Sequence, residues 1–186
     1  MQAGRRSPPS DLPANPAAFM LSGDAALRKV GSFRFPVYKL ATDGEVLARL
    51  GRPGWWRIFF GRGQPIELAD GTPWRLRAVG LAGAICPVIV DRDIRKVAQA
   101  APGPGGYGLN GRDWAYELVP WERHRFVRAN QWILREHERD VAIVTRSPWE
   151  IATTSPVPLG AAILALTLAL YSIPGESDLG VPRFRW

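Results

Sequence analysis

Short stretches of alternating apolar and polar residues fill the chain between residues 32 and 79. A period of two is typical of strands that bury one face. Turn signals separate the stretches, and Asp43-Gly44 and Asp70-Gly71 are dipeptides that favour tight hairpins. Such spacing is typical of an antiparallel sandwich or barrel, and the strand–helix alternation of a parallel sheet is absent. The predicted strands cover residues 32–37, 45–50, 55–60, 66–68 and 74–79.

The second half of the chain continues in the same style. Residues 102–106, Pro-Gly-Pro-Gly-Gly, predict a loop, and residues 103–108 predict a flexible connector. The range 91–101 fits either a short helix or a strand with a polar face. A strand, a Pro-containing turn and Trp-x-Ile follow one another in residues 45–58 and again in 140–151, which suggests an internal duplication. Further strands are predicted at residues 81–90, 114–119, 125–134, 141–145 and 149–151.

The two ends of the chain are predicted to lie outside the compact domain. Residues 1–30 are predicted to be a disordered, Pro-rich leader with a short helical turn at 24–30. The domain itself is predicted to span residues 31–174. Residues 175–186 are expected to form a flexible tail that is both basic and aromatic.

An uncharged segment at residues 151–175 contains the strongest helix signal. Residues 158–173 begin with proline, are rich in Leu and Ala, and stop before Pro174-Gly175. A helix that is apolar on all sides is buried either in protein or in lipid. Residues 159–173 would span about 22 Å, whereas a bilayer core is about 30 Å thick. The length favours a helix that fills a closed barrel, and a membrane anchor at residues 157–173 is the alternative.

These motifs resemble the tubby C-terminal-like fold, which tubby, phospholipid scramblase and LURP-one related proteins share. The resemblance covers residues 32–174 and includes the Asp-Gly turns, the Ser-Pro-Trp-Glu-Ile segment at 147–151 and the helix from Pro158. It implies a closed antiparallel barrel of twelve strands around a central C-terminal helix. It also implies phosphoinositide binding through basic residues, as in tubby proteins, or membrane association with calcium binding, as in scramblases. Neither site transfers, because calcium-loop spacing and the tubby lysine motif are not found.

The net charge of +7 makes membrane surfaces and nucleic acid the obvious acidic partners. Lysine occurs only at positions 29, 39 and 96, and the other basic residues are arginine. Arginine, glycine, proline and alanine are also what a GC-rich, bacterial genome encodes. The charge therefore has two interpretations, an anion-binding face or a solvated surface that reflects codon usage.

Two groups of arginines next to aromatic residues are the candidate anion-binding residues. Arg57 and Arg62 flank Phe59-Phe60, and the second group lies between Trp121 and Trp132. Arginine beside aromatic side chains suits lipid headgroups at an interface, and it also suits stacking on nucleic-acid bases. The alternative is simple strand alternation with arginine outward. The second group consists of Arg123, Arg125 and Arg128.

No sequence motif predicts catalysis, a metal site or a cofactor. His124 and His137 lie among charged residues without metal-ligand spacing. Asp91 and Asp93 would share one face of a strand, which suits acid/base or metal chemistry, but a charged turn explains them as well. No phosphate-binding loop or nucleophile motif is present. An enzyme that uses Asp91 and Asp93 is therefore the weaker hypothesis.

Cys86 is the only cysteine, and it is predicted to be a small buried hydrophobe. The first residues lack the apolar stretch of a secretory signal. We therefore expect a cytoplasmic protein that is not secreted, either free or peripheral at the membrane. The leading hypothesis is a non-catalytic binding or scaffold domain that binds anionic lipid headgroups at a membrane surface. The alternative is a membrane-anchored protein, while nucleic-acid binding rests on charge alone.

Overall fold

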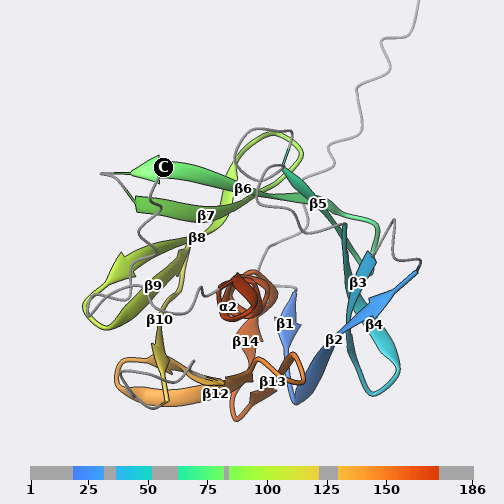
Figure 1. Cartoon of the computed structure of the whole chain (residues 1–186). Coiled ribbons are helices and arrows are strands. Elements are labelled where there is room, and N and C mark those ends of the chain that lie inside the picture. Colours follow the sequence, from blue (N-terminus) through green and yellow to red (C-terminus); the bar gives the residue numbers. More distant parts are fainter. Residues whose placement is uncertain (1–18, 32–36, 52–62, 82–83, 122–129, 172–186) are drawn as a thin grey trace, which may run out of the picture.

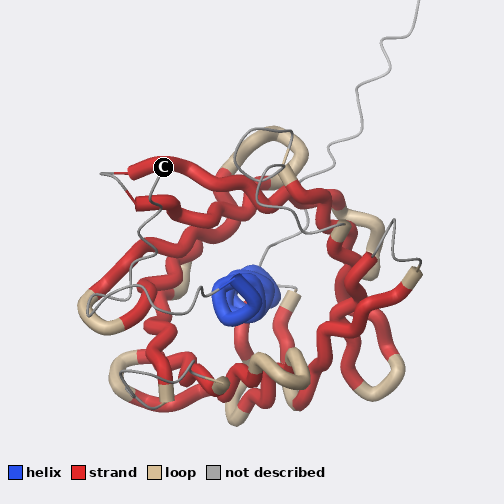
Figure 2. Tube along the Cα trace, viewed as in Figure 1, coloured by secondary structure: helices blue, strands red, loops and turns tan. Residues whose placement is uncertain are grey.

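The computed structural model describes residues 19–31, 37–51, 63–81, 84–121 and 130–171. Within these ranges, twelve antiparallel strands form a closed barrel, so the predicted fold class is confirmed (Figures 1 and 2). The strands are β2 (Asp24–Val30), β3 (Val37–Thr42), β4 (Glu45–Leu50), β5 (Gln64–Leu68), β6 (Pro73–Leu81), β7 (Ala84–Val90), β8 (Lys96–Gly103), β9 (Gly106–Gly111), β10 (Ala115–Pro120), β11 (Gln131–Glu136), β12 (Arg139–Thr145) and β13 (Glu150–Thr153).

Helix α2 (Leu159–Tyr171) lies along the axis of this barrel and fills it (Figure 2). From Leu159 to Ala169, no described side chain of α2 is more than 8% exposed. The only polar side chain in this stretch, Thr167, donates its hydroxyl proton to the carbonyl oxygen of Ile163 at 2.6 Å, so the helix satisfies it internally. The segment that the sequence left open as a membrane anchor is therefore enclosed by strands, as the buried-helix prediction requires.

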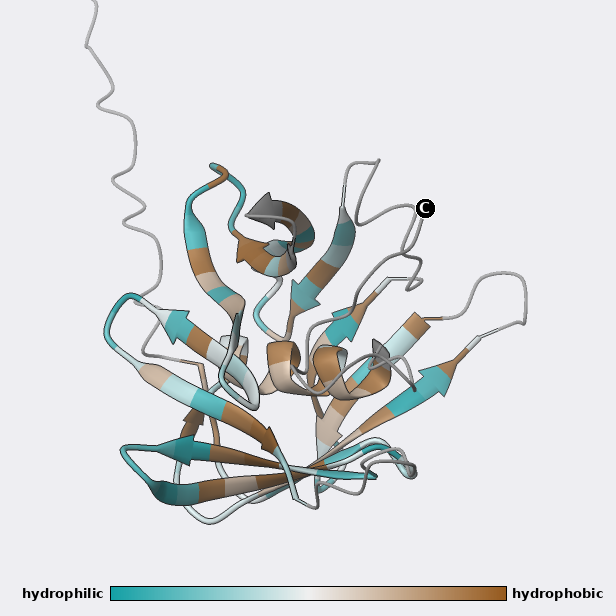
Figure 3. Cartoon of the chain, turned by 60° about the vertical axis from the view of Figure 1, so that its left-hand side comes forward, coloured by the Kyte–Doolittle hydropathy of each residue, from teal (hydrophilic) through white to brown (hydrophobic). Residues whose placement is uncertain are grey.

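A short two-stranded sheet leads into the helix at one end of the barrel. β1 (Met20–Leu21) pairs with β14 (Val157–Pro158), and the backbone N–H of Leu159 donates to the carbonyl oxygen of Phe19 at 2.7 Å. Small residues then allow the helix to approach the wall closely. A Cβ atom added to Gly160 would lie 3.2 Å from the Cβ of Ala98 on β8. The alternating hydropathy of the strands and the uniformly apolar helix are visible in Figure 3.

The barrel consists of three successive groups of four strands, β2–β5, β6–β9 and β10–β13. In each group, the hairpin between the second and third strands has a β-bulge in its third strand. In each case, a large buried aliphatic residue pairs with an alanine, and the next pair skips one residue. The paired residues are Leu40 with Ala48, Ile89 with Ala98, and Leu134 with Ala142, and the skipped residues are Leu47, Val97 and Val141.

The first and third of these hairpins match most closely. The pair next to the bulge is Leu40 with Ala48 in the first hairpin and Leu134 with Ala142 in the third. Each pair encloses the same length of chain, nine residues when both ends are counted. Both turns have two residues with positive φ, Asp43 and Gly44 in one, and His137 and Glu138 in the other. The duplication predicted for residues 45–58 and 140–151 can be compared only over β4 and β12, because residues 52–58 lie outside the described residues.

Three predictions about local structure are wrong. The predicted leader at residues 1–30 includes β1 and β2, and residues 24–30 form a barrel strand instead of a helical turn. Residues 103–108 are not a connector, because a two-residue turn at Pro104-Gly105 joins β8 to β9. In β2 and in the β8–β9 hairpin, pairing with neighbouring strands outweighs a local composition that favours irregular structure. The range 91–101, left open between helix and strand, contains a turn followed by strand β8.

Other predictions agree with the structure where it can be compared. The helix predicted at 158–173 corresponds to α2, and residues 172–173 lie outside the described residues. Cys86 is buried as predicted, and its burial raises the pKa of the thiol. The predicted strand at 55–60 and the tail at 175–186 lie outside the described residues.

Replacing Leu164 by alanine should lower the free energy of unfolding by about 2–5 kcal/mol, because the site is fully enclosed and cannot collapse around the cavity. Urea unfolding followed by tryptophan fluorescence measures this change. Val79→Ala on the outer wall, where the side chain is 47% exposed, is the control and should cost less than about 1 kcal/mol. Equal losses in the two variants would contradict the role of α2 as the filling of the barrel.

Candidate anion-binding face

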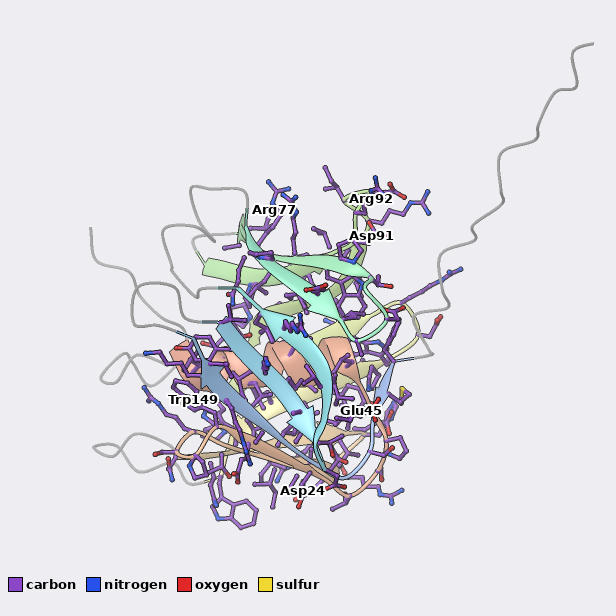
Figure 4. All side chains as sticks on the ribbon, turned by 90° about the vertical axis from the view of Figure 1, so that its right-hand side faces the viewer. Asp24, Glu45, Arg77, Asp91, Arg92 and Trp149 are labelled. Atoms are coloured by element: carbon purple, nitrogen blue, oxygen red, sulfur yellow. The ribbon has the colours of Figure 1, made fainter. Side chains whose placement is uncertain are left out.

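The connections between strands alternate between the two ends of the barrel. We call the end where α2 begins the amino rim and the opposite end the carboxyl rim. The carboxyl rim carries the connections β2–β3, β4–β5, β6–β7, β8–β9, β10–β11 and β12–β13. In Figure 4 it lies on the left with Trp149, whereas Glu45, Asp91 and Arg92 lie toward the amino rim on the right.

All five arginines predicted from the sequence lie outside the described residues. Arg57 and Arg62 fall in the range 52–62, and Arg123, Arg125 and Arg128 fall in the range 122–129. The described strand ends that border these two ranges, Leu50 and Gln64 for the first, and Pro120 and Gln131 for the second, are all at the carboxyl rim. The topology therefore attaches both segments to the same end of the barrel.

The charges of the described residues differ between the two ends. In the described ranges, Asp and Glu are as numerous as Lys and Arg, so the net charge of +7 comes from the remaining residues. The described turns of the amino rim are rich in carboxylates, and the described strand ends of the carboxyl rim include Glu150. The acidic residues at the amino rim are Asp24, Asp43, Glu45, Asp70, Asp91, Asp93, Asp113, Glu136 and Glu138, and the basic residues there are Arg92, Arg95, Lys96, Arg112 and Arg139, so acidic residues outnumber basic ones at this end.

Three basic residues form a row across the outer wall, nearer to the carboxyl rim. Arg28 on β2 is directly opposite Lys39 on β3, and Lys39 is directly opposite Arg49 on β4. We call these three residues the basic row. Their neighbours Leu27, Leu40 and Ala48 point into the core, so the alternation of each strand directs the row outward. Arg28 and Arg49 are exposed, and Lys39 is half-buried.

Like charges directly opposite each other on a sheet destabilise it, and the rest of the wall avoids this arrangement at several positions. Arg135 on β11 pairs with Asp140 on β12, and their side chains form an ion pair with an Nε–Oδ1 distance of 2.7 Å. Glu136 lies opposite Arg139, and Glu67 lies opposite Arg49 at the end of the basic row. The basic row is therefore an exception among these cross-strand charge pairs.

Sequence reasoning missed the basic row for an identifiable reason. Arg28 was assigned to a disordered leader, so its strand and its partner Lys39 could not be predicted. The sequence signal for this strand was weak, because Ala26 stands between Ala25 and Leu27 and two basic residues, Arg28 and Lys29, follow one another. Register between separate strands depends on turn geometry and on the bulge after Leu40, and a single sequence does not specify these.

Asp91, one of the two carboxylates behind the enzyme hypothesis, has a local structural role. Oδ1 of Asp91 accepts hydrogen bonds from the backbone N–H of Asp93 at 2.9 Å and from that of Arg95 at 2.8 Å. This is the turn-forming interpretation of Asp91. Among the described residues, no group of three or more His, Cys, Asp or Glu side chains is arranged to hold a metal ion. His137 lies in the tight turn between β11 and β12, and His124 lies outside the described residues.

No helix in the described ranges is long and apolar enough to cross a membrane. Searches against protein-family models, curated proteins and solved structures found no match to this chain.

The turn held by Asp91 contains a conformational conflict at Ile94. This β-branched residue has a φ of +64° and is 68% exposed, so it adopts a left-handed conformation without burying its side chain. Asparagine tolerates this region better, and Ile94→Asn should raise the free energy of unfolding by about 1 kcal/mol in urea unfolding. Ile94→Val keeps the branched Cβ and should give no gain. A destabilised Ile94→Asn variant would show that the isoleucine side chain stabilises the fold by other contacts.

Proposed function

We propose that this protein is a non-catalytic binding domain that attaches to anionic lipid headgroups at a membrane surface. The observation that carries the proposal is the basic row, in which Arg28, Lys39 and Arg49 are in direct register on one exposed wall. Under this proposal, Arg57, Arg62, Arg123, Arg125 and Arg128, which lie outside the described residues, remain candidates for headgroup binding.

The energetic argument concerns the unbound and the bound states. Each like-charge pair costs the free domain about 0.2–1 kcal/mol. A layer of phosphate groups replaces this repulsion by attraction, and each basic residue near an anionic surface contributes about 1 kcal/mol. The row is thus slightly unfavourable in isolation and favourable against a sheet of negative charge. Screening makes such attachment weaker at high salt.

A membrane surface fits the described face better than nucleic acid does. The basic row lies in a continuous outer sheet of β2, β3 and β4, and Glu67 on β5 limits its width. The acidic amino rim favours an arrangement with one end of the molecule toward the anionic surface and the other away from it. The resemblance to tubby-like proteins concerns the fold, a twelve-stranded barrel around a C-terminal helix, and the proposal rests on the basic row and not on that resemblance.

The test is sedimentation of the full-length protein with vesicles of phosphatidylcholine that contain 30% phosphatidylglycerol. The triple variant Arg28→Gln, Lys39→Gln, Arg49→Gln should bind these vesicles about 100-fold more weakly, since about 1 kcal/mol is lost at each of three positions. The same variant should unfold at the same or a slightly higher urea concentration, because the like-charge pairs are removed. Binding should also weaken with added salt.

The matched control removes the same charge from the opposite end of the barrel. Arg92→Gln, Arg95→Gln, Lys96→Gln changes three basic residues in the turn and strand at the amino rim. This control should bind vesicles within about twofold of the wild-type protein. Equal losses in both triple variants, or wild-type affinity in the basic-row variant, would refute the proposal. Tighter binding to single-stranded DNA than to vesicles would identify nucleic acid as the partner instead.

A further inference from the structure

Large apolar side chains are exposed at the carboxyl rim. Val30 and Val37, which face each other at the end of β2 and the start of β3, are 41% and 37% exposed. Val79 near the end of β6 is 47% exposed, and Trp121, directly after β10, is 50% exposed. We call these four residues the apolar rim residues.

The apolar rim residues occupy equivalent places in the three groups of strands. Each lies at or near the connection between the first and second strands of its group, which are β2–β3, β6–β7 and β10–β11. In the closed order of the barrel, these connections recur every four strands. The exposed residues are therefore distributed around the rim at three separated places and do not form one lateral patch. The three places therefore surround the barrel axis at one end of the barrel.

We infer that the carboxyl rim inserts its apolar residues into the boundary between headgroups and acyl chains of an anionic bilayer, with the barrel axis close to the membrane normal. This inference rests on the proposed function and specifies its partner as a bilayer, in contrast to a soluble anion. Valine and tryptophan suit this depth, because the boundary accepts apolar side chains and the amphipathic indole ring. The basic row lies beside the rim, since Arg28 and Lys39 are each two residues from the Val30–Val37 pair.

Charge explains why the opposite end is not the inserting one. Met20 and Ile94 are also exposed at the amino rim, at 44% and 68%. Asp91 and Asp93 lie in the same turn as Ile94 together with Arg92 and Arg95, and Asp24 begins the strand that follows Met20. Over the described residues of the whole amino rim, nine acidic residues outnumber the five basic ones, so an anionic surface repels this end. At the carboxyl rim, Glu150 is the acidic residue among the described strand ends, and the basic row compensates it.

The first test compares two variants that remove exposed apolar residues from opposite ends. The variant Val30→Ser, Val37→Ser, Val79→Ser, Trp121→Ser should bind phosphatidylglycerol-containing vesicles at least tenfold more weakly. Its affinity for soluble glycerol phosphate, measured by NMR titration, should not change, because the basic row is intact. Met20→Ser, Ile94→Ser is the control and should bind vesicles like the wild-type protein.

The second test measures depth directly and does not depend on the stability of the quadruple variant. In a Cys86→Ser background, a nitroxide label is placed at Val79→Cys or at Ile94→Cys, and its accessibility to oxygen and to a water-soluble nickel complex is measured on vesicles. The label at position 79 should become protected from nickel and accessible to oxygen. The label at position 94 should remain in water.

The outcomes separate the inference from the function on which it rests. If the basic-row variant loses vesicle binding while the apolar-rim variant does not, the lipid-binding function holds and insertion is wrong. Water exposure of the label at 79 on bound protein would also overturn insertion. If the wild-type protein does not bind the vesicles at all, both proposals fail.

Discussion

A barrel of twelve strands has an interior too wide for its own side chains to fill, and this constraint governs the rest of the structure. Helix α2 fills this interior, and its buried surface is apolar on every side. Where the helix and the wall approach closely, both have small residues, Gly160 on α2 and Ala98 on β8. The one polar side chain of the enclosed segment, Thr167, bonds to its own helix and leaves no donor unsatisfied. The width of the barrel and the size of the α2 side chains therefore have to match.

Because the interior is occupied by apolar packing, the surfaces available for binding are the outer wall and the rims. The regular antiparallel order places every second connection at the same end, so segments distant in sequence converge there. The same order aligns Arg28, Lys39 and Arg49 across three strands. The proposed anion-binding residues are therefore brought together by strand register and topology, and they do not form one contiguous sequence motif.

Much of the architecture could be predicted from the sequence, and the candidate site could not. The hairpin at Asp43-Gly44 and the helix from residue 158 follow from local chemistry, since positive φ favours glycine and Leu and Ala favour helix. Strand β2 was missed because it follows a Pro-rich segment, and β9 was missed because glycine-rich strands are stabilised by their partners and not by propensity. The basic row depends on β2 and on a bulge in β4, so its prediction failed with that of β2.

The closure of the barrel joins parts of the chain that are made at very different times. Strand β2 pairs with β13, through Ala26 with Glu150 and Asp24 with Ala152, and the helix that fills the interior follows β13 in sequence. During synthesis on the ribosome, the nascent wall therefore exposes an apolar inner surface and two unpaired strand edges until the last of its partners has emerged. Proteins that depend on such late, long-range pairing fold slowly and are prone to aggregate before completion. We expect the barrel to close only after β13 and α2 have been synthesised, and to need chaperone protection until α2 enters the interior.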